Sequence, residues 1–193
     1  PHWTKRYYGN TARVLMELNM AFSTQFEDFV GINLIFPEVY GPNSRFNPRR
    51  NNIIEAVITN IKAAQENDID LPVEGTRKAS RDFLYIDDAV KAIHDVIQFA
   101  DEPETYNVSQ GYDVNIKTLH KMVADIAGYE REIIWTETQA DIKERTFLNI
   151  GLIQKDIGWS PKTNLEEGLR KTMEWHDQNL TVGILSPDTL LVR

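Results

Sequence analysis

The sequence runs RDFLYIDDAVKAIHDVIQF from Arg81 to Phe99, and its hydrophobic period changes part of the way along. The short apolar run Phe83–Ile86 is typical of a buried strand. Asp87 can then cap the start of a helix, because its carboxylate accepts hydrogen bonds from the first free backbone amides. The apolar residues that follow recur at helical spacing: Ala89, Val90, Ile93, Val96 and Ile97. The stretch therefore predicts a strand that leads directly into an amphipathic helix.

The same alternation of strand and helix patterns extends in both directions along the chain. Further buried strands are expected at Ile32–Phe36, Leu71–Glu74, Thr105–Val108 and Glu132–Trp135. Helical spacing covers Thr11–Phe29, Ile53–Gln65, a segment that Asn115 begins and Gly128 ends, and a segment that Asn164 begins with a capping box. Pro37–Asn52 is rich in Pro, Gly, Asn and Arg and predicts a loop. Strands that alternate with helices predict an α/β fold with parallel strands.

The two ends of the chain carry weaker patterns. Residues 1–180 are expected to form the folded part, and residues 181–193 read as a tail. The chain starts at Pro1, and its methionines lie at Met16, Met20, Met122 and Met173. None of its ten glycines forms the G-x-G-x-x-G loop that cradles a dinucleotide. We therefore expect the chain to be part of a longer polypeptide whose nucleotide-binding half is absent here.

The composition is that of an ordinary globular protein. The 193 residues are 41% hydrophobic and 26% charged, and 29 Asp and Glu against 21 Lys and Arg give a net charge of −8. An acidic chain without a basic block is a poor match for nucleic acid, and no apolar run approaches the roughly 20 residues of a membrane span. The absence of cysteine excludes disulfides, thiolate metal sites and a cysteine nucleophile. These features predict a cytoplasmic protein without a membrane or nucleic-acid partner.

Four motifs occur in a fixed order. They are Tyr8–Thr11 (YGNT), Glu38–Asn43 (EVYGPN), Arg81–Asp88 (RDFLYIDD), and Gly158–Pro161 (GWSP) followed by Leu165–Leu169 (LEEGL). In this order and spacing, from about Tyr7 to Gln178, the chain resembles the extended short-chain dehydrogenase/reductase family, specifically its nucleotide-sugar epimerases and dehydratases. Its middle and end look most like the GDP-fucose synthase branch of that group.

The resemblance implies a fold, a cofactor and a reaction. The fold would be the C-terminal part of a Rossmann-like doubly wound sheet plus the small substrate-binding α/β subdomain. Members of the family bind NAD or NADP, mainly on a half that this chain lacks. They epimerise, dehydrate or reduce a sugar carried on a nucleoside diphosphate. Relatives often form homodimers through two long helices, one of which follows the catalytic tyrosine.

Tyr8 matches the family tyrosine, which acts as general acid/base beside the cofactor. In the family a lysine four residues later lowers the pKa of the phenol, and a shift of about three units corresponds to roughly 4 kcal/mol. Here that position is Ala12, and Arg13 lies about 100° further round the helix. Tyr8 is therefore either the proton donor or a tyrosine at a helix start. The second interpretation implies a catalytically degenerate relative that acts as a sugar-nucleotide-binding or scaffold protein.

Two arginines match positions that contact the diphosphate in the family. Arg81 precedes Asp82-Phe83, and Arg145 falls where a second phosphate-contacting arginine often lies. A guanidinium suits phosphate because it donates two parallel hydrogen bonds. The alternative is a surface arginine paired with Asp or Glu. The nearby carboxylates Asp82, Asp87 and Asp88 are expected to cap and orient the following helix rather than to touch a ligand.

Three further residues are expected to line the substrate. Asn43 and Arg45 lie in the loop where relatives close over the nucleotide base, although a solvated loop is the plain alternative. Glu38 stands where the family usually has an asparagine that touches the sugar nucleotide. A carboxylate there would repel a diphosphate unless it is protonated or turned away.

No metal site is expected. The four histidines are scattered at His2, His94, His120 and His176, without carboxylates at metal-ligand spacing. All four are interpreted as structural or surface residues.

Overall fold

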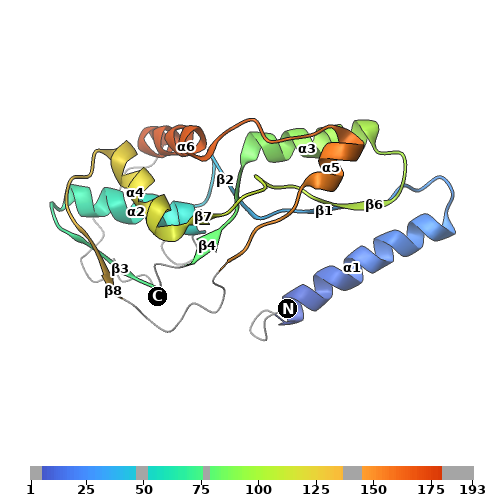
Figure 1. Cartoon of the computed structure of the whole chain (residues 1–193), viewed down its shortest axis with the longest axis horizontal. Helices are drawn as coiled ribbons and strands as arrows, with labels where there is room; N and C mark the ends of the chain where they lie inside the picture. Colours follow the sequence, from blue (N-terminus) through green and yellow to red (C-terminus); the bar gives the residue numbers. More distant parts are fainter. Residues whose placement is uncertain (1–5, 47–51, 76–78, 137–144, 180–193) are drawn as a thin grey trace.

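Helices and strands alternate along the chain in a computed structural model that describes residues 6–46, 52–75, 79–136 and 145–179 (Figure 1). The helices are α1 Arg6–Gln25, α2 Ile53–Glu66, α3 Ile86–Phe99, α4 Ile116–Ala127, α5 Gly151–Ile157 and α6 Leu165–Asn179. The strands are β1 Ile32–Ile35, β2 Glu38–Tyr40, β3 Leu71–Glu74, β4 Ser80–Arg81, β5 Phe83–Tyr85, β6 Glu104–Asn107, β7 Val114–Asn115 and β8 Ile133–Thr136.

The strands pair mostly in parallel. Parallel pairs form between β1 and β6, between β2 and β5, and between β3 and β8. The two-residue strands β4 and β7 pair antiparallel, with Arg81 opposite Val114. The prediction of an α/β fold with parallel strands is therefore confirmed, because parallel neighbours need the helical crossovers that the alternating pattern supplies.

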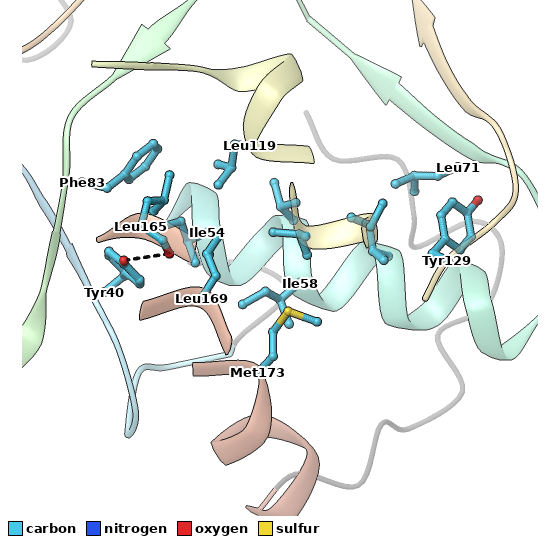
Figure 2. Close-up of a cluster of buried hydrophobic side chains, with 14 of the residues drawn as sticks. Tyr40, Ile54, Ile58, Leu71, Phe83, Leu119, Tyr129, Leu165, Leu169 and Met173 are labelled. Carbon is cyan, nitrogen blue, oxygen red and sulfur yellow. Dashed lines mark hydrogen bonds between the residues drawn. The ribbon is translucent and has the colours of Figure 1, made fainter. Parts of the chain in front are cut away.

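The buried hydrophobic residues form two clusters, carried by elements that lie in different parts of the fold (Figure 1). The first is buried among α2, α4 and α6, where Ile58, Leu119 and Leu169 are fully inaccessible (Figure 2). The second joins α3 and α5 to β1, β5 and β6, with Leu84 and Ile153 fully inaccessible. Most members of both clusters come from segments with predicted helical or strand patterns, but Tyr40 of β2 and Ile153 of α5 do not.

α6 approaches the strands of the first cluster very closely. Tyr40, at the end of β2, donates from its hydroxyl to the backbone oxygen of Leu165 at 3.4 Å (Figure 2). A Cβ atom added to Gly168 would lie 2.1 Å from that same hydroxyl oxygen. Glycine at this position therefore lets α6 lie directly on the ring of Tyr40.

α1 stands apart from both clusters (Figure 1). Asn19 donates to the side chain of Asn33 at 3.0 Å, and the Ser23 hydroxyl accepts from the backbone of Gly31 at 2.8 Å. Large apolar side chains of this helix and the turn after it remain 42–62% exposed: Val14, Leu15, Leu18, Phe22, Phe26, Phe29 and Val30. α1 is thus joined to β1 near its C-terminal end and presents an uncovered apolar face.

The ends of the helices partly follow the predictions. The side chain of Asn115 accepts from the backbone amide of Lys117, and Gly128 ends α4 in the left-handed conformation. The side chain of Asn164 likewise accepts from the backbone of Glu167 at 2.9 Å. These three predictions are confirmed.

Asp87 does not cap α3 as predicted. The helix begins at Ile86, and Tyr85 occupies the capping position without a side-chain bond. Asp88 in the first turn is buried and accepts from the backbone amides of Lys162 and Thr163 at 3.0 and 2.9 Å. The carboxylate of Asp88 therefore fixes the segment before α6 to α3.

Several elements differ from the predicted boundaries. The expected loop 37–52 contains β2, which is only three residues long and forms because β5 supplies its hydrogen-bonding partner. α1 begins and ends about four residues earlier than the predicted Thr11–Phe29. The predicted tail, residues 181–193, and His2 lie outside the described residues.

Candidate functional site

The two candidate arginines come from neighbouring backbone segments. Arg81 lies on β4, and the residue before it, Ser80, forms an isolated parallel bridge with Arg145. The backbone amide of Thr146 donates to the Ser80 oxygen at 3.2 Å. The structure therefore brings together the two positions at which the sequence predicted diphosphate contacts, as one strip that contains Ser80, Arg81 and Arg145.

A buried carboxylate fixes this strip. Asp82 is 2% exposed and accepts from the backbone amides of Gln110 and Leu148 at 3.3 and 3.1 Å. Burial raises the pKa of Asp82, although these bonds and one to Ser109 oppose the rise. Asp82 thus joins the turn before β7 to the segment that carries Arg145, and it supports the strip rather than capping α3.

The guanidinium group of Arg145 is paired with Asp113. Its Nε donates to both carboxylate oxygens at 3.0 Å, and its Nη2 donates to one of them at 2.8 Å. Its Cζ lies 4.5 Å from the centre of the Phe147 ring. These hydrogen bonds, with another from Ser80, lower the pKa of Asp113 to about 2. The Arg145 side chain nevertheless remains 65% exposed.

The guanidinium group of Arg81 lies against its own strand. Its Nη1 donates to the backbone oxygen of Ser80 at 2.8 Å, and the side chain is half-buried. The same oxygen accepts from the amide of Thr146. Ser80 is therefore connected to both arginines. Its backbone oxygen accepts from Arg81, and its hydroxyl donates to Asp113, which in turn pairs with Arg145.

The predicted substrate loop turns sharply after β2. Asn43 has a φ angle of +64°, and both Asn43 and Arg45 are exposed. Phe46 then packs against α6, with its ring 4.7 Å from that of His176 and 6.2 Å from that of Trp175. The loop thus presents its polar side chains to solvent while its last described residue is held by α6.

Glu38 faces the start of α2. Its Oε2 accepts from the backbone amide of Ile53 at 3.4 Å. A carboxylate at a helix N-terminus is favoured because unpaired amides and the helix dipole attract negative charge there. Part of the negative charge of Glu38 is therefore matched within the fold.

Tyr8 lies near the free end of α1. Its side chain is 81% exposed, and Ala12 one turn later is exposed as well. The bonds of Asn19 and Ser23 that join α1 to β1 come from the other end of the helix. Tyr8 is thus carried on a solvent-facing part of α1, away from the connection to β1.

Asp113 and Ser80 belong to the site but were missed by sequence reasoning. The sequence suggests an acidic partner for the arginines but does not identify it. Asp113 follows Gly111, which has a φ angle of +81°, in a short turn before β7. Only that turn and the acidic residue type mark the position in the sequence, and neither identifies Arg145 as the partner.

Neither a metal-binding cluster nor a membrane-spanning helix occurs among the described residues. Among them, no group of three or more His, Asp or Glu side chains is placed to hold a metal ion. None of the described helices combines the length and the apolar character needed to cross a bilayer.

Comparison with known proteins gives matches along most of the chain. The sequence model of the NAD dependent epimerase/dehydratase family matches residues 2–109. Probable GDP-L-fucose synthase 1 of Oryza sativa subsp. japonica is 28% identical over 178 residues, which are 92% of this chain and 54% of that protein.

Two solved structures have the same fold. UDP-glucose 4-epimerase of Thermotoga maritima, determined with UDP-glucose, gives a TM-score of 0.69 at 23% identity, over 84% of this chain and 52% of that one. RMD from Pseudomonas aeruginosa, complexed with NADPH, gives 0.71 at 23% identity, over 84% of this chain and 54% of that one. The chain spans about half the length of these relatives.

Proposed function

Because the chain belongs to the NAD dependent epimerase/dehydratase family, we propose that it forms the substrate half of an enzyme that acts on a nucleoside-diphosphate sugar. The reaction is an NAD(P)-dependent epimerisation, dehydration or reduction of the sugar. Residues 1–180 form this half. The observation that carries the proposal is the strip that places Arg81 and Arg145 on adjacent backbone segments.

The strip has the chemistry that a diphosphate requires. Two guanidinium groups can each donate paired hydrogen bonds to phosphate oxygens, and both stay charged at any physiological pH. Arg145 is largely exposed and Arg81 is half-buried, so a ligand can reach the strip from solvent. Asn43 and Arg45, on the exposed loop, contact the nucleotide in this proposal.

Glu38 is compatible with such a ligand. Its carboxylate bonds to the Ile53 amide, at the start of α2. The helix N-terminus offsets its charge, so the repulsion that the sequence suggested is reduced. We place Glu38 at the edge of the substrate site, where it supports the loop between β2 and α2.

The cofactor would be NAD or NADP, held mainly by a second half of the enzyme. Support comes from the open side of β1, which pairs with β6 alone among the described strands. Beside it lies a groove of about 460 Å³, lined by residues that include Asn19, Ile32, Leu34 and Ile97. The nicotinamide, when bound, supplies the hydride chemistry, and the exposed side of β1 offers a surface for the half that binds it.

Tyr8 would exchange the proton in this reaction. It is exposed near the free end of α1, so its hydroxyl can face a substrate between the two halves. The position that carries lysine in relatives is Ala12, which supplies no cation. A second candidate function follows from this one feature: the chain binds a sugar nucleotide without turning it over.

The variant Ala12→Lys separates the two functions. Assayed together with the cofactor-binding half, a nucleoside-diphosphate sugar and NAD(P)H by nicotinamide absorbance, a gain of turnover would show that only the cation beside Tyr8 is missing. Turnover by the wild-type protein would instead exclude the binding-only function.

Thermal stabilisation tests the substrate class. A ligand that binds only the folded chain raises the melting temperature by mass action. We expect UDP- or GDP-sugars to stabilise the wild-type chain and to lose that effect in Arg81→Ala. The control is Arg131→Ala, which removes an exposed arginine that pairs with Asp68 and not with any residue of the strip. An undiminished shift in Arg81→Ala would contradict the diphosphate role.

A further inference from the structure

Asp113 bonds to two residues of the strip, although it belongs to none of the four sequence motifs. Its carboxylate accepts from Nε and Nη2 of Arg145 and from the hydroxyl of Ser80. The side chain is only 15% exposed, whereas that of Arg145 is 65% exposed. The acid is therefore fixed in the fold, and it holds an arginine that otherwise extends into solvent.

The geometry of this pair leaves part of the guanidinium for a ligand. Asp113 takes the edge formed by Nε and Nη2. A guanidinium group carries five N–H donors, so its Nη1/Nη2 edge remains as a second face that can bind a planar or tetrahedral anion. Arg145 can therefore bind a phosphate while its bond to Asp113 persists.

Ser80 extends the effect of Asp113 to the other arginine. Its hydroxyl bonds to Asp113, and its backbone oxygen accepts from Nη1 of Arg81 at 2.8 Å. The same oxygen also accepts from the amide of Thr146, next to Arg145. Asp113 thus contacts Arg145 directly and is connected to Arg81 through Ser80.

Holding an arginine before the ligand arrives favours binding. A long side chain that is free in solution loses rotamer freedom when a ligand immobilises it, and a side chain already held loses less. The Asp113 pKa of about 2 keeps its carboxylate charged, and hence able to hold Arg145, throughout the physiological pH range.

We propose that Asp113 is a positioning residue that holds Arg145, and through Ser80 also Arg81, in the orientation that receives the diphosphate of the substrate. The inference rests on the proposed function and adds to it a residue that does not itself touch the ligand. Asp113 acts through its hydrogen bonds to the arginine and to Ser80.

Titration calorimetry with Asp113→Asn tests this role. The amide keeps the shape of the side chain but loses the charge and one acceptor oxygen. We expect UDP and GDP to bind about 3- to 10-fold more weakly than to the wild-type chain, which is the effect of freeing one long side chain. Uridine and guanosine, which lack phosphates, should bind the two proteins equally, since a general structural defect would weaken all four ligands.

The chain provides a matched control. Arg131 and Asp68 form an exposed ion pair that uses the same guanidinium edge, with Nε–Oδ1 at 2.7 Å and Nη2–Oδ2 at 3.0 Å. Asp68→Asn should leave the affinity for all four ligands unchanged. Ser80→Ala is the second test variant, because it keeps the Arg145 pair and the Arg81 bond to the backbone oxygen and removes only the hydroxyl bond to Asp113. It should weaken UDP and GDP binding in the same direction and by a smaller factor.

The outcomes distinguish the positioning role of Asp113 from the proposed function. If the wild-type chain binds UDP or GDP and both Asp113→Asn and Ser80→Ala bind them equally well, the positioning role is overturned and the proposed function stands. Tighter binding by Asp113→Asn also overturns it, because the carboxylate would then compete with phosphate for Arg145. If the wild-type chain binds neither diphosphate, the proposed function fails, and the inference fails with it.

Discussion

The guanidinium groups of the two arginines in the strip are held in different ways. Arg81 bonds to a backbone oxygen of its own strand, whereas Arg145 bonds to the carboxylate of Asp113. Family motifs in the sequence indicated both arginines. The sequence could not indicate Asp113 or Ser80, because their roles depend on a bridge between backbone segments that lie far apart along the chain.

A second acid, Glu55, is more deeply buried and only partly hydrogen-bonded. Glu55 in α2 is 1% exposed, and its Oε2 lacks any hydrogen bond among the described residues. Burial raises the pKa of Glu55, although a bond from Ser44 opposes the rise. The folded state therefore disfavours the charged form of this group, and the free energy of unfolding falls as pH rises from about 4.5 to the folded-state pKa.

Glu55→Gln should stabilise the chain at pH 7. The substitution removes a buried charge and keeps the shape, so we expect about 1 kcal/mol of added stability, or roughly 2–4 °C in melting temperature. The gain should vanish below about pH 4, where the wild-type carboxyl is protonated in both states. Thermal unfolding across this pH range measures it.

The control for Glu55 is an exposed acid on the same helix. Glu66→Gln should change the melting temperature by less than about 1 °C at every pH, since a solvated carboxylate carries no burial penalty. A wild-type chain more stable than Glu55→Gln at pH 7 would contradict the account of this buried group.

Among secondary-structure elements, length decided what the sequence could predict. α2, α3, α4 and α6, with 12 to 15 residues each, show clear apolar periodicity and were expected. The strands β2, β4 and β7 have two or three residues, and α5 has seven. Elements this short carry too few residues to show a period, and they form because tertiary neighbours complete their hydrogen bonds. β5, also three residues long, was expected only because all of its residues are apolar.

The close contact between α6 and β2 predicts how a substitution at Gly168 changes stability. Gly168→Ala would normally stabilise a helix by about 1 kcal/mol. Here the new Cβ would lie 2.1 Å from the hydroxyl oxygen and 2.9 Å from Cζ of Tyr40. We expect a loss of about 1–3 kcal/mol instead, measured by urea unfolding.

A double-mutant cycle provides the control for Gly168→Ala. Adding Tyr40→Phe removes the atom nearest to the new methyl group, so the combined loss should be smaller than the sum of the single losses. Stabilisation by Gly168→Ala alone would show that α6 does not lie against Tyr40.

For the whole molecule, the family motifs indicated the architecture, and the family match confirms that resemblance. The motifs could not show which faces are left open. The apolar face of α1 and the groove beside β1 are both uncovered, and they adjoin at Val30, which belongs to both. We propose that α1 forms a homodimer interface, while the groove receives the half that binds the cofactor.

Size-exclusion chromatography with light scattering tests whether α1, and not the groove, forms the homodimer interface. The wild-type chain should have about twice its 22.3 kDa mass. Phe22→Glu places a charge on the α1 face and should give the monomer mass. Ile97→Glu, on the exposed face of α3 beside the groove, should leave the dimer intact. Dissociation by Ile97→Glu and not by Phe22→Glu would reverse the assignment of the two surfaces.

The central claim is that the strip of Ser80, Arg81 and Arg145 binds the diphosphate of a sugar nucleotide. Titration calorimetry of UDP- and GDP-sugars into the wild-type chain and into Arg81→Ala/Arg145→Ala tests it most directly. We predict saturable binding by the wild-type chain and affinity at least about 100-fold weaker in the double variant, since each lost charged contact is worth about 1.5–3 kcal/mol. Equal affinity in the two proteins, or no binding by the wild-type chain, would contradict the claim.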